Sequence, residues 1–152
     1  MDKSPSDHKV ECTLVLSRIY NKPVERVWRA WSEEKEFGQW YVAGDDHVVH
    51  FAQSDFRVGG NYRVGFGPPG TKPWVEEGTF LEIVPNRKIV FQERVAREGE
   101  QAGFAVTRTS VEFKDLGGRT ELVFTTTGRD TWRAGEGWTP CMESLARFLD
   151  NN

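Results

Sequence analysis

A strand followed by two short helices is predicted at the start of the patterned part of the chain. Residues 12–20 are rich in side chains that favour strands and place Cys12, Leu14 and Leu16 on one face, which is typical of a β-strand. The period then becomes helical, with one apolar stripe made by Val24, Val27, Trp28 and Trp31. Pro23 suits the first position of this helix, where its missing N–H is not needed. Ser32 is placed to cap a second short helix, which carries Phe37, Trp40 and Tyr41.

The middle of the chain has the pattern of successive strands separated by turn residues. The strands are expected at residues 48–56, 61–66, 74–84, 88–95, 106–113 and 119–127. No helical period interrupts this run, so we expect an antiparallel sheet. Residues 1–9 are polar and are expected to form a flexible tail, which leaves residues 10–152 as a single domain.

The last segment returns to a helical period and predicts an amphipathic C-terminal helix. Its apolar stripe consists of Trp138, Cys141, Met142, Leu145, Phe148 and Leu149, with Glu143 and Arg147 off the stripe. A long helix with one apolar stripe must bury it, and the concave face of the sheet is the available partner. The pattern therefore predicts an α+β domain with six to seven strands.

Composition narrows the class of protein. The chain has 152 residues, a net charge of −3, and six Trp and ten Phe, which indicate either a bulky core or an aromatic-lined cavity. Lys and Arg are scattered, which argues against nucleic-acid binding. The first ten residues hold no apolar run, and no stretch approaches the ~20 apolar residues of a membrane span. We expect a cytoplasmic protein whose two cysteines are free thiols.

One short stretch matches the letters of a dinucleotide-binding motif. Residues 65–70 read GFGPPG, which fits G-x-G-x-x-G. That motif needs a helix after the glycines, whereas another predicted strand follows here, and Pro68 and Pro69 remove two N–H donors. The stretch is therefore interpreted as a hairpin loop, and no cofactor is expected.

Few side chains have a pattern that indicates chemistry. Cys141 lies near the start of the last helix, where a thiol pKa can fall, but core or cavity lining is the favoured role. His47 and His50, three apart on a strand, would point to opposite faces, so no metal site is expected. Strand carboxylates are usually solvated, but one that faced inward would have a raised pKa and become a candidate acid or base; the candidates are Glu76, Glu77, Glu82, Glu93 and Glu112.

Several motifs, in order, resemble one known family. They lie at residues 18–31, 55–63, 78–91, 118–122 and 137–149, together with Trp40. In this order they are similar to the Hsp90-ATPase-activator-like family (AHSA1, Aha1 C-terminal-like) of the START/Bet v 1-like (SRPBCC) superfamily. The segment 21–23, NKP, departs from the usual Ala-Pro pair of the family.

The resemblance implies a helix-grip fold, in which a curved sheet wraps around the C-terminal helix and encloses a cavity. Pockets for small molecules are mostly apolar with a few polar groups. The residues expected to line this cavity are Trp40, Phe51, Tyr62, Phe66, Trp74, Phe80, Phe91, Trp138, Cys141, Met142 and Leu145. No catalytic residue is assigned.

Three functions are consistent with the sequence. The first is a non-catalytic domain that binds a small apolar or aromatic molecule or a lipid. The second is a cyclase, dehydratase or hydrolase that acts in the cavity, and the third is a module that binds an Hsp90-type chaperone. A monomer or a homodimer is expected in each case.

Overall fold

The structure is a computed structural model that describes residues 12–97, 106–128 and 134–152. The tail expected at residues 1–9 lies outside the described residues. The elements follow the order β1, α1, α2, six further strands and α3. The strands are β1 (Cys12–Tyr20), β2 (Val48–Ser54), β3 (Asn61–Gly67), β4 (Trp74–Val84), β5 (Lys88–Arg97), β6 (Thr107–Asp115) and β7 (Thr120–Gly128). The helices are α1 (Val24–Ser32), α2 (Glu34–Trp40) and α3 (Ala134–Asp150).

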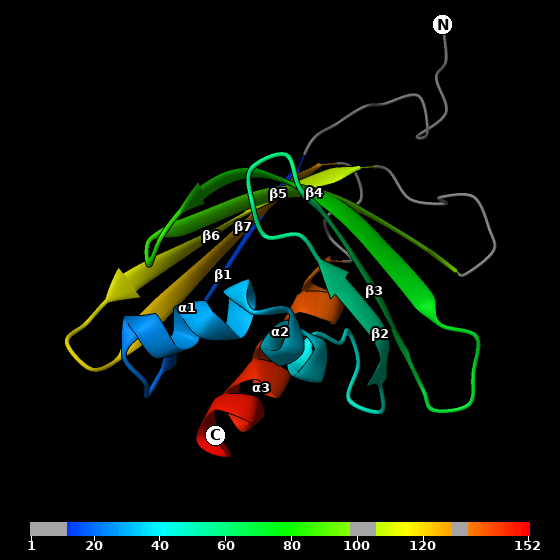
Figure 1. The fold of residues 1–152 in the computed structure, drawn as a ribbon, viewed down its shortest axis with the longest axis horizontal. Coiled ribbons are helices and arrows are strands. Elements are labelled where there is room, and N and C mark those ends of the chain that lie inside the picture. Colours follow the sequence, from blue (N-terminus) through cyan, green and yellow to red (C-terminus); the bar gives the residue numbers. More distant parts are fainter. Residues whose placement is uncertain (1–11, 98–105, 129–133) are drawn as a thin grey trace, which may run out of the picture.

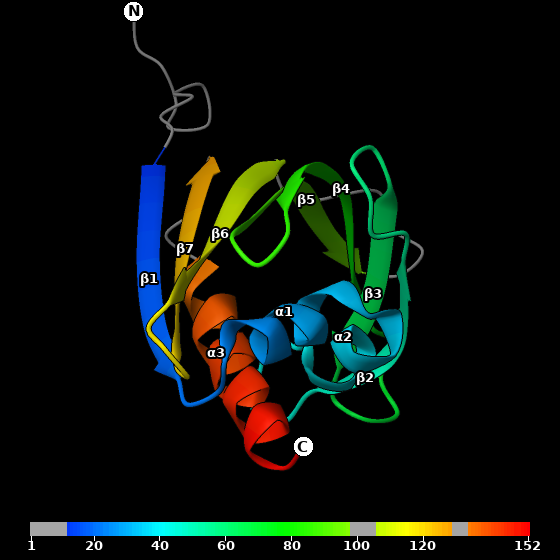
Figure 2. The ribbon, with the colours of Figure 1, turned by 60° about the vertical axis from the view of Figure 1, so that its left-hand side comes forward.

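All seven strands form one antiparallel sheet in the order β1-β7-β6-β5-β4-β3-β2. The sheet curves into a trough that holds all three helices on its concave side (Figure 1 and Figure 2). Register shifts between Val49 and Phe51 and between Phe80 and Glu82 mark β-bulges, which increase local bending of a strand. The helix-grip α+β fold expected from the sequence is confirmed.

Helix α3 lies along the trough, as its apolar stripe predicts. All six stripe residues are buried, and Leu145 is fully enclosed. Glu143 and Arg147, which the pattern places off the stripe, are exposed. The Tyr20 hydroxyl on β1 donates to the Met142 carbonyl of α3 at 3.0 Å, which fixes the helix against the edge of the sheet.

The connection between α1 and α2 corrects one expectation. Ser32 is the last residue of α1, and Glu33, with an extended backbone, precedes α2 without a side-chain cap. Glu34 and Glu36 lie in the first turn of α2, where the helix dipole stabilises negative charge. Pro23 directly precedes α1, and its carbonyl accepts from the Arg26 amide at 3.0 Å.

The GFGPPG stretch ends β3 and enters the β3–β4 connection. Residues 68–73 join two antiparallel neighbours, as the sequence interpretation expects. Thr71 closes the turn, because its hydroxyl donates to the Pro68 carbonyl at 2.7 Å. Gly70 has a φ of 76°, a left-handed conformation that favours glycine.

Candidate functional site

A band of buried polar side chains crosses the concave face of the sheet beneath α3. Strands β3 to β7 supply most of it, and one residue comes from the end of α2. This polar band consists of Tyr41, Tyr62, Glu76, Glu93, Thr109 and Thr126, which are buried, and Thr107, which is half-buried. Polar groups in such a position cost free energy unless they are hydrogen-bonded, so their partners define the site.

Glu76 on β4 is held by two phenols. Its Oε2 accepts from the Tyr41 hydroxyl at 2.7 Å and from the Tyr62 hydroxyl at 2.5 Å. The residue is only 7% exposed. Burial raises the pKa of Glu76 to about 7, although the two phenol hydrogen bonds act in the opposite direction. Burial and the Glu76 charge both raise the pKa of each tyrosine, so the phenols remain protonated donors.

Glu93 on β5 is held by two threonines from β6. Its Oε1 accepts from the hydroxyls of Thr107 and Thr109, each at 2.6 Å, and Thr109 lies 3.0 Å from the Thr126 hydroxyl. Its other oxygen, Oε2, is buried and has no hydrogen-bond partner among the described residues. Burial raises the pKa of Glu93 well above its ordinary value, and the nearby Glu76 charge raises it further.

The strand register explains why the two carboxyl groups face the same side. Glu93 lies opposite Gly78, which is two residues along β4 from Glu76, so both side chains point into the trough. Gly78 also lies opposite Tyr62 on β3. A Cβ atom on Gly78 would lie 2.2 Å from Cε1 of Tyr62, so the absent side chain makes room for the phenol ring that reaches Glu76.

Helix α3 covers the polar band with Trp138 and Cys141. The Trp138 ring centroid lies 5.9 Å from Tyr41 and 5.0 Å from Phe124. Cys141 is 3% exposed, and burial followed by the Glu76 charge raises its thiol pKa. Cys141 is the eighth residue of α3 rather than one near its start, so the helix terminus does not activate the thiol.

Some residues expected to line a cavity come together at this site. The Tyr62 centroid lies 5.3 Å from Phe80 and 5.7 Å from Phe91, and Trp138 lies 6.3 Å from Phe91. These rings form an aromatic wall beside the polar band. Cys141, Met142 and Leu145 face the same space from α3, where all three are buried.

Other expected lining residues lie around the polar band rather than in it. Trp40 packs among the helices, where its Nε1 donates to the Ala30 carbonyl at 2.9 Å and its ring centroid lies 5.4 Å from that of Tyr41. Phe66 stacks on His47 at 5.9 Å, and Trp74 is partly buried at the start of β4.

Phe51 does not share the concave face, which corrects its expected place. A bulge at His50 shifts the register, so Phe51 pairs with Gly65 on the outer face of the sheet. A Cβ atom on Gly65 would lie 2.3 Å from the Phe51 ring. Arg63 covers the ring from the other side, with its guanidinium carbon 4.9 Å from the centroid.

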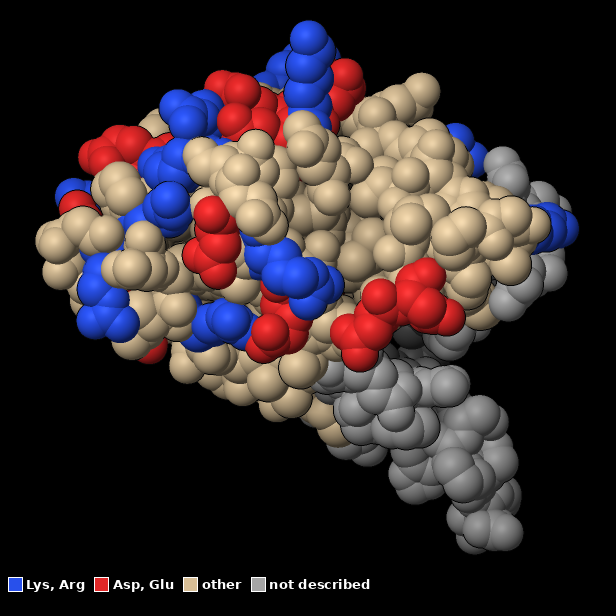
Figure 3. Space-filling model, turned by 90° about the horizontal axis from the view of Figure 1, so that it is seen from below, with Lys and Arg blue, Asp and Glu red and all other residues tan. Residues whose placement is uncertain are grey.

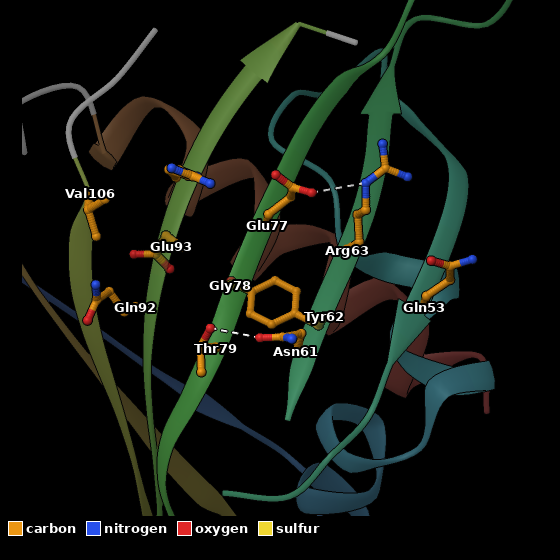
Figure 4. Close-up of a pocket in the computed structure, with 11 residues that line it drawn as sticks. Gln53, Asn61, Tyr62, Arg63, Glu77, Gly78, Thr79, Gln92, Glu93 and Val106 are labelled. Atoms are coloured by element: carbon orange, nitrogen blue, oxygen red, sulfur yellow. Dashed lines mark hydrogen bonds and ion pairs between the residues drawn. The ribbon is translucent and has the colours of Figure 1, made fainter. Parts of the chain in front are cut away.

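The outer face of the sheet carries a different kind of hollow (Figure 4). This outer groove has a volume of about 520 Å³, and its mainly polar lining across β2 to β5 includes Tyr62, Gly78 and Glu93, which also belong to the site on the concave face. Figure 4 shows Arg63 paired with Glu77 and Thr79 paired with Asn61, at 3.2 Å and 2.8 Å. The outer groove therefore lacks the apolar wall that is typical of a small-molecule pocket.

Charge is unevenly spread over the molecule. Seen from below, charged side chains of both signs gather on the side of α1 and the β6–β7 hairpin (Figure 3). The side of the β3–β4 connection is largely uncharged, and residues 64–75 include one charged side chain, Lys72.

His47 and His50 have separate surroundings, and of the two only His50 lies on a strand. His47 lies against Phe66 in the loop before β2, whereas His50 Nε2 lies 3.3 Å from the Gly67 carbonyl oxygen. Across residues 12–97, 106–128 and 134–152, no group of three or more His, Cys, Asp or Glu side chains converges as metal ligands would. Within the same ranges, no helix has the length and apolar character to cross a membrane.

Sequence reasoning named Glu76 and Glu93 as candidates but did not select them, and it missed Tyr41, Thr107 and Thr109. The signal for the glutamates was present. Phe91 was assigned to one face of its strand, and Glu93, two residues further on, must share that face. Tyr41 follows the end of α2, where no periodic pattern applies.

Comparison with known proteins gives the family. The family model described as "Activator of Hsp90 ATPase homolog 1-like protein" matches residues 21–150. No curated protein matches the chain. A solved protein from Rhizobium leguminosarum is 26% identical with a TM-score of 0.81, covering 95% of this chain and 98% of its own.

Two further solved structures have the same fold. Mll3558 from Rhizobium loti is 30% identical with a TM-score of 0.73, covering 93% of this chain and 99% of its own. An AHSA1-like protein from Aeromonas hydrophila is 17% identical with a TM-score of 0.75, covering 92% and 93%. The chain belongs to the Activator of Hsp90 ATPase homolog 1-like family of the START/Bet v 1-like superfamily.

Proposed function

We propose that this protein binds a small, largely apolar molecule between the sheet and α3, and that the polar band fixes the polar group of that molecule. One observation carries the proposal: two carboxyl groups, Glu76 and Glu93, are buried side by side beside an aromatic wall. A few convergent polar groups in apolar surroundings are typical of a small-molecule site.

The energetics of the carboxyl pair support a functional role. No ion pair of the described residues includes Glu76 or Glu93, so neither charge is neutralised by a cation. Burying an ionisable group without a counter-charge destabilises a fold, and groups with a strongly altered pKa cluster at functional sites. The uncharged surface near the β3–β4 connection is also compatible with the approach of an apolar molecule.

Binding can be tested with a thermal-shift panel of fatty acids, aromatic ketones and polyphenols, followed by native mass spectrometry of the hits. We expect at least one class to raise Tm in proportion to its concentration, because a molecule that binds only the folded state stabilises it. Glu76→Gln should alter this response. Glu77→Gln is the matched control, because the next residue along β4 faces the outer groove.

A response that is the same in both variants would place the bound molecule outside the polar band. If no class in the panel binds, the proposed function is wrong.

A second function, acid–base catalysis at the same site, is favoured by one observation. The pKa of Glu76 is raised to about 7, and a general acid or base works best when its pKa lies near the operating pH. Glu76→Gln would then abolish turnover of a bound compound while leaving its Kd within a few-fold. A pure binding protein would leave every bound compound chemically unchanged.

The family description adds a third candidate, stimulation of an Hsp90-type ATPase. It is tested by adding the protein in excess to the purified chaperone and measuring ATP hydrolysis. An unchanged rate excludes a direct role. The cytoplasmic location and the monomeric or homodimeric state remain proposals from the sequence.

A further inference from the structure

We propose that Glu93 is kept as a neutral carboxylic acid whose Oε2 donates a hydrogen bond to an oxygen of the bound molecule, so that the site selects carbonyl compounds over amines. This inference rests on the proposed binding function and adds the chemical class of the ligand. It follows from how the two oxygens of Glu93 are used.

The hydrogen bonds of Glu93 distinguish its two oxygens. Oε1 accepts from both Thr107 and Thr109 at 2.6 Å. Both lone pairs of Oε1 are used by these hydroxyls, so in the neutral acid the proton lies on Oε2. Oε2 is buried and unpartnered among the described residues, which leaves a donor without an acceptor.

The surroundings of Glu93 favour the neutral acid. The charged or titratable group that acts on it is Glu76 of β4, whose negative charge opposes a second negative charge nearby. The groups from β6 are threonine hydroxyls, and no described Lys, Arg or His forms an ion pair with it. A buried carboxyl group in such surroundings takes up a proton rather than carry a charge.

Glu76 and Glu93 therefore present different hydrogen-bonding groups to a ligand. Glu76 already accepts two phenol hydrogen bonds on one oxygen, whereas Glu93 has an unused donor. The carbonyl oxygen of a ligand can accept a hydrogen bond from Oε2 of Glu93. The apolar part of the same ligand can then contact Phe91 and Trp138, whose ring centroids are 6.3 Å apart. A hydrocarbon would leave the donor unsatisfied, and an ammonium group would place a donor against a donor.

Three naphthalenes of similar shape test this selection: 2-acetylnaphthalene, 2-ethylnaphthalene and 1-(2-naphthyl)ethylamine. Their Kd values are measured by calorimetry at pH 6, below the pKa of Glu76, where that carboxyl group is also mostly neutral and does not attract a cation. We expect the ketone to bind roughly 2- to 10-fold more tightly than the hydrocarbon, as one net hydrogen bond contributes. The amine should bind most weakly.

Two substitutions at Glu93 distinguish the effect of its hydrogen-bond donor from the effect of its charge. Glu93→Gln keeps an N–H donor and should keep the preference for the ketone, whereas Glu93→Leu should remove it. Glu77→Gln, on the outer face, should bind like the wild type. Circular dichroism and urea unfolding establish that each variant is folded before its Kd is compared.

Infrared spectroscopy gives an answer that needs no ligand. At pH 8 Glu76 is mostly ionised, so a remaining carboxylic-acid carbonyl band that disappears in Glu93→Gln reports a neutral Glu93. Absence of that band overturns the inference, as does tightest binding by the amine, and both leave ligand binding itself intact. If none of the three naphthalenes binds but the band is present, the neutral acid stands and the selection for carbonyl compounds is wrong.

Discussion

Neighbouring glutamates in this protein have opposite environments. Glu76 points into the trough and is held by two tyrosines, whereas Glu77 points outward and pairs with Arg63. A period of two along the strand separates them completely. The chemistry of each carboxyl group therefore follows from its parity in the strand rather than from its residue type.

Glu76→Gln is expected to change how stability depends on pH. The folded-state pKa of about 7 lies above the ordinary value of 4.5, so the folded protein binds this proton more tightly than the unfolded chain does. The stabilisation is fully present below about pH 4.5 and is lost as the pH rises through about 7. Urea unfolding should show the free energy of unfolding of the wild type falling, relative to Glu76→Gln, by on the order of 3 kcal/mol over this range.

Glu77→Gln is the control for that titration, because its carboxyl group is exposed. The two glutamine variants should differ from each other in slope between pH 4.5 and 7. Parallel curves for the wild type and Glu76→Gln would show that Glu76 titrates normally.

Gly78→Ala is expected to destabilise the protein by about 1–3 kcal/mol, as overpacking of a core does. The new methyl group would meet the Tyr62 ring at 2.2 Å, which must then move away from Glu76. Gly137→Ala is the matched control, because its Cβ would lie at an ordinary 3.4 Å from Ala43. Thermal unfolding of both variants gives the comparison, and equal Tm values would contradict the close packing at Gly78.

Most elements could be predicted from the sequence because their periods are long and regular. The six later strands and α3 each repeat their period over several residues, and the structure confirms them. Ser32 and Phe51 could not be placed correctly, because each depends on a local break in the backbone. The bulge at His50 inverts the face of Phe51 and leaves no mark in the hydrophobic pattern.

The site was harder to predict than the fold. Its carboxyl groups are indistinguishable from solvated strand acids until strand faces are assigned to the core. Glu76 lies four residues from Phe80 and Glu93 lies two residues from Phe91, so each glutamate shares a strand face with a core phenylalanine. Assigning those phenylalanines to the core would have predicted that both glutamates face inward. Tyr41 enters the polar band through the bend after α2, and only the three-dimensional arrangement places it there.

Two phenylalanines on opposite faces should respond differently to the same truncation. Phe91→Ala removes a ring that is 2% exposed and should cost about 3–5 kcal/mol. Phe51→Ala removes a ring that is partly exposed on the outer face and should cost clearly less. Denaturant unfolding measures the loss of unfolding free energy in each variant. Equal losses would show that Phe51 packs in the core as Phe91 does.

At the scale of the whole molecule, α3 separates the polar band from solvent. On the concave side Trp138, Cys141 and Leu145 of α3 are buried, whereas Glu93 also lines the outer groove. The proposed binding between the sheet and α3 therefore requires an opening of the trough on the concave side.

The two cysteines report on that opening. Cys12 is exposed and Cys141 is buried, so an aromatic disulfide reagent should modify one thiol quickly and the other slowly. The slow rate, that of Cys141, measures how often α3 moves away from the sheet. The Cys12→Ala variant should lose the fast reaction and keep the slow one. A bound molecule beneath α3 should slow it further, whereas rapid reaction of both thiols would show that the trough is open in solution.

The pairing of β1 with β7 has a consequence for the synthesis of this protein. The first strand emerges from the ribosome long before its partner, and Leu16 meets Phe124 only after five further strands have been synthesised. Until then the sheet edge and the apolar wall lack both β7 and α3, and contacts so distant in sequence form slowly. The nascent chain therefore leaves this surface uncovered throughout the synthesis of β2 to β6, a period in which aggregation competes with folding.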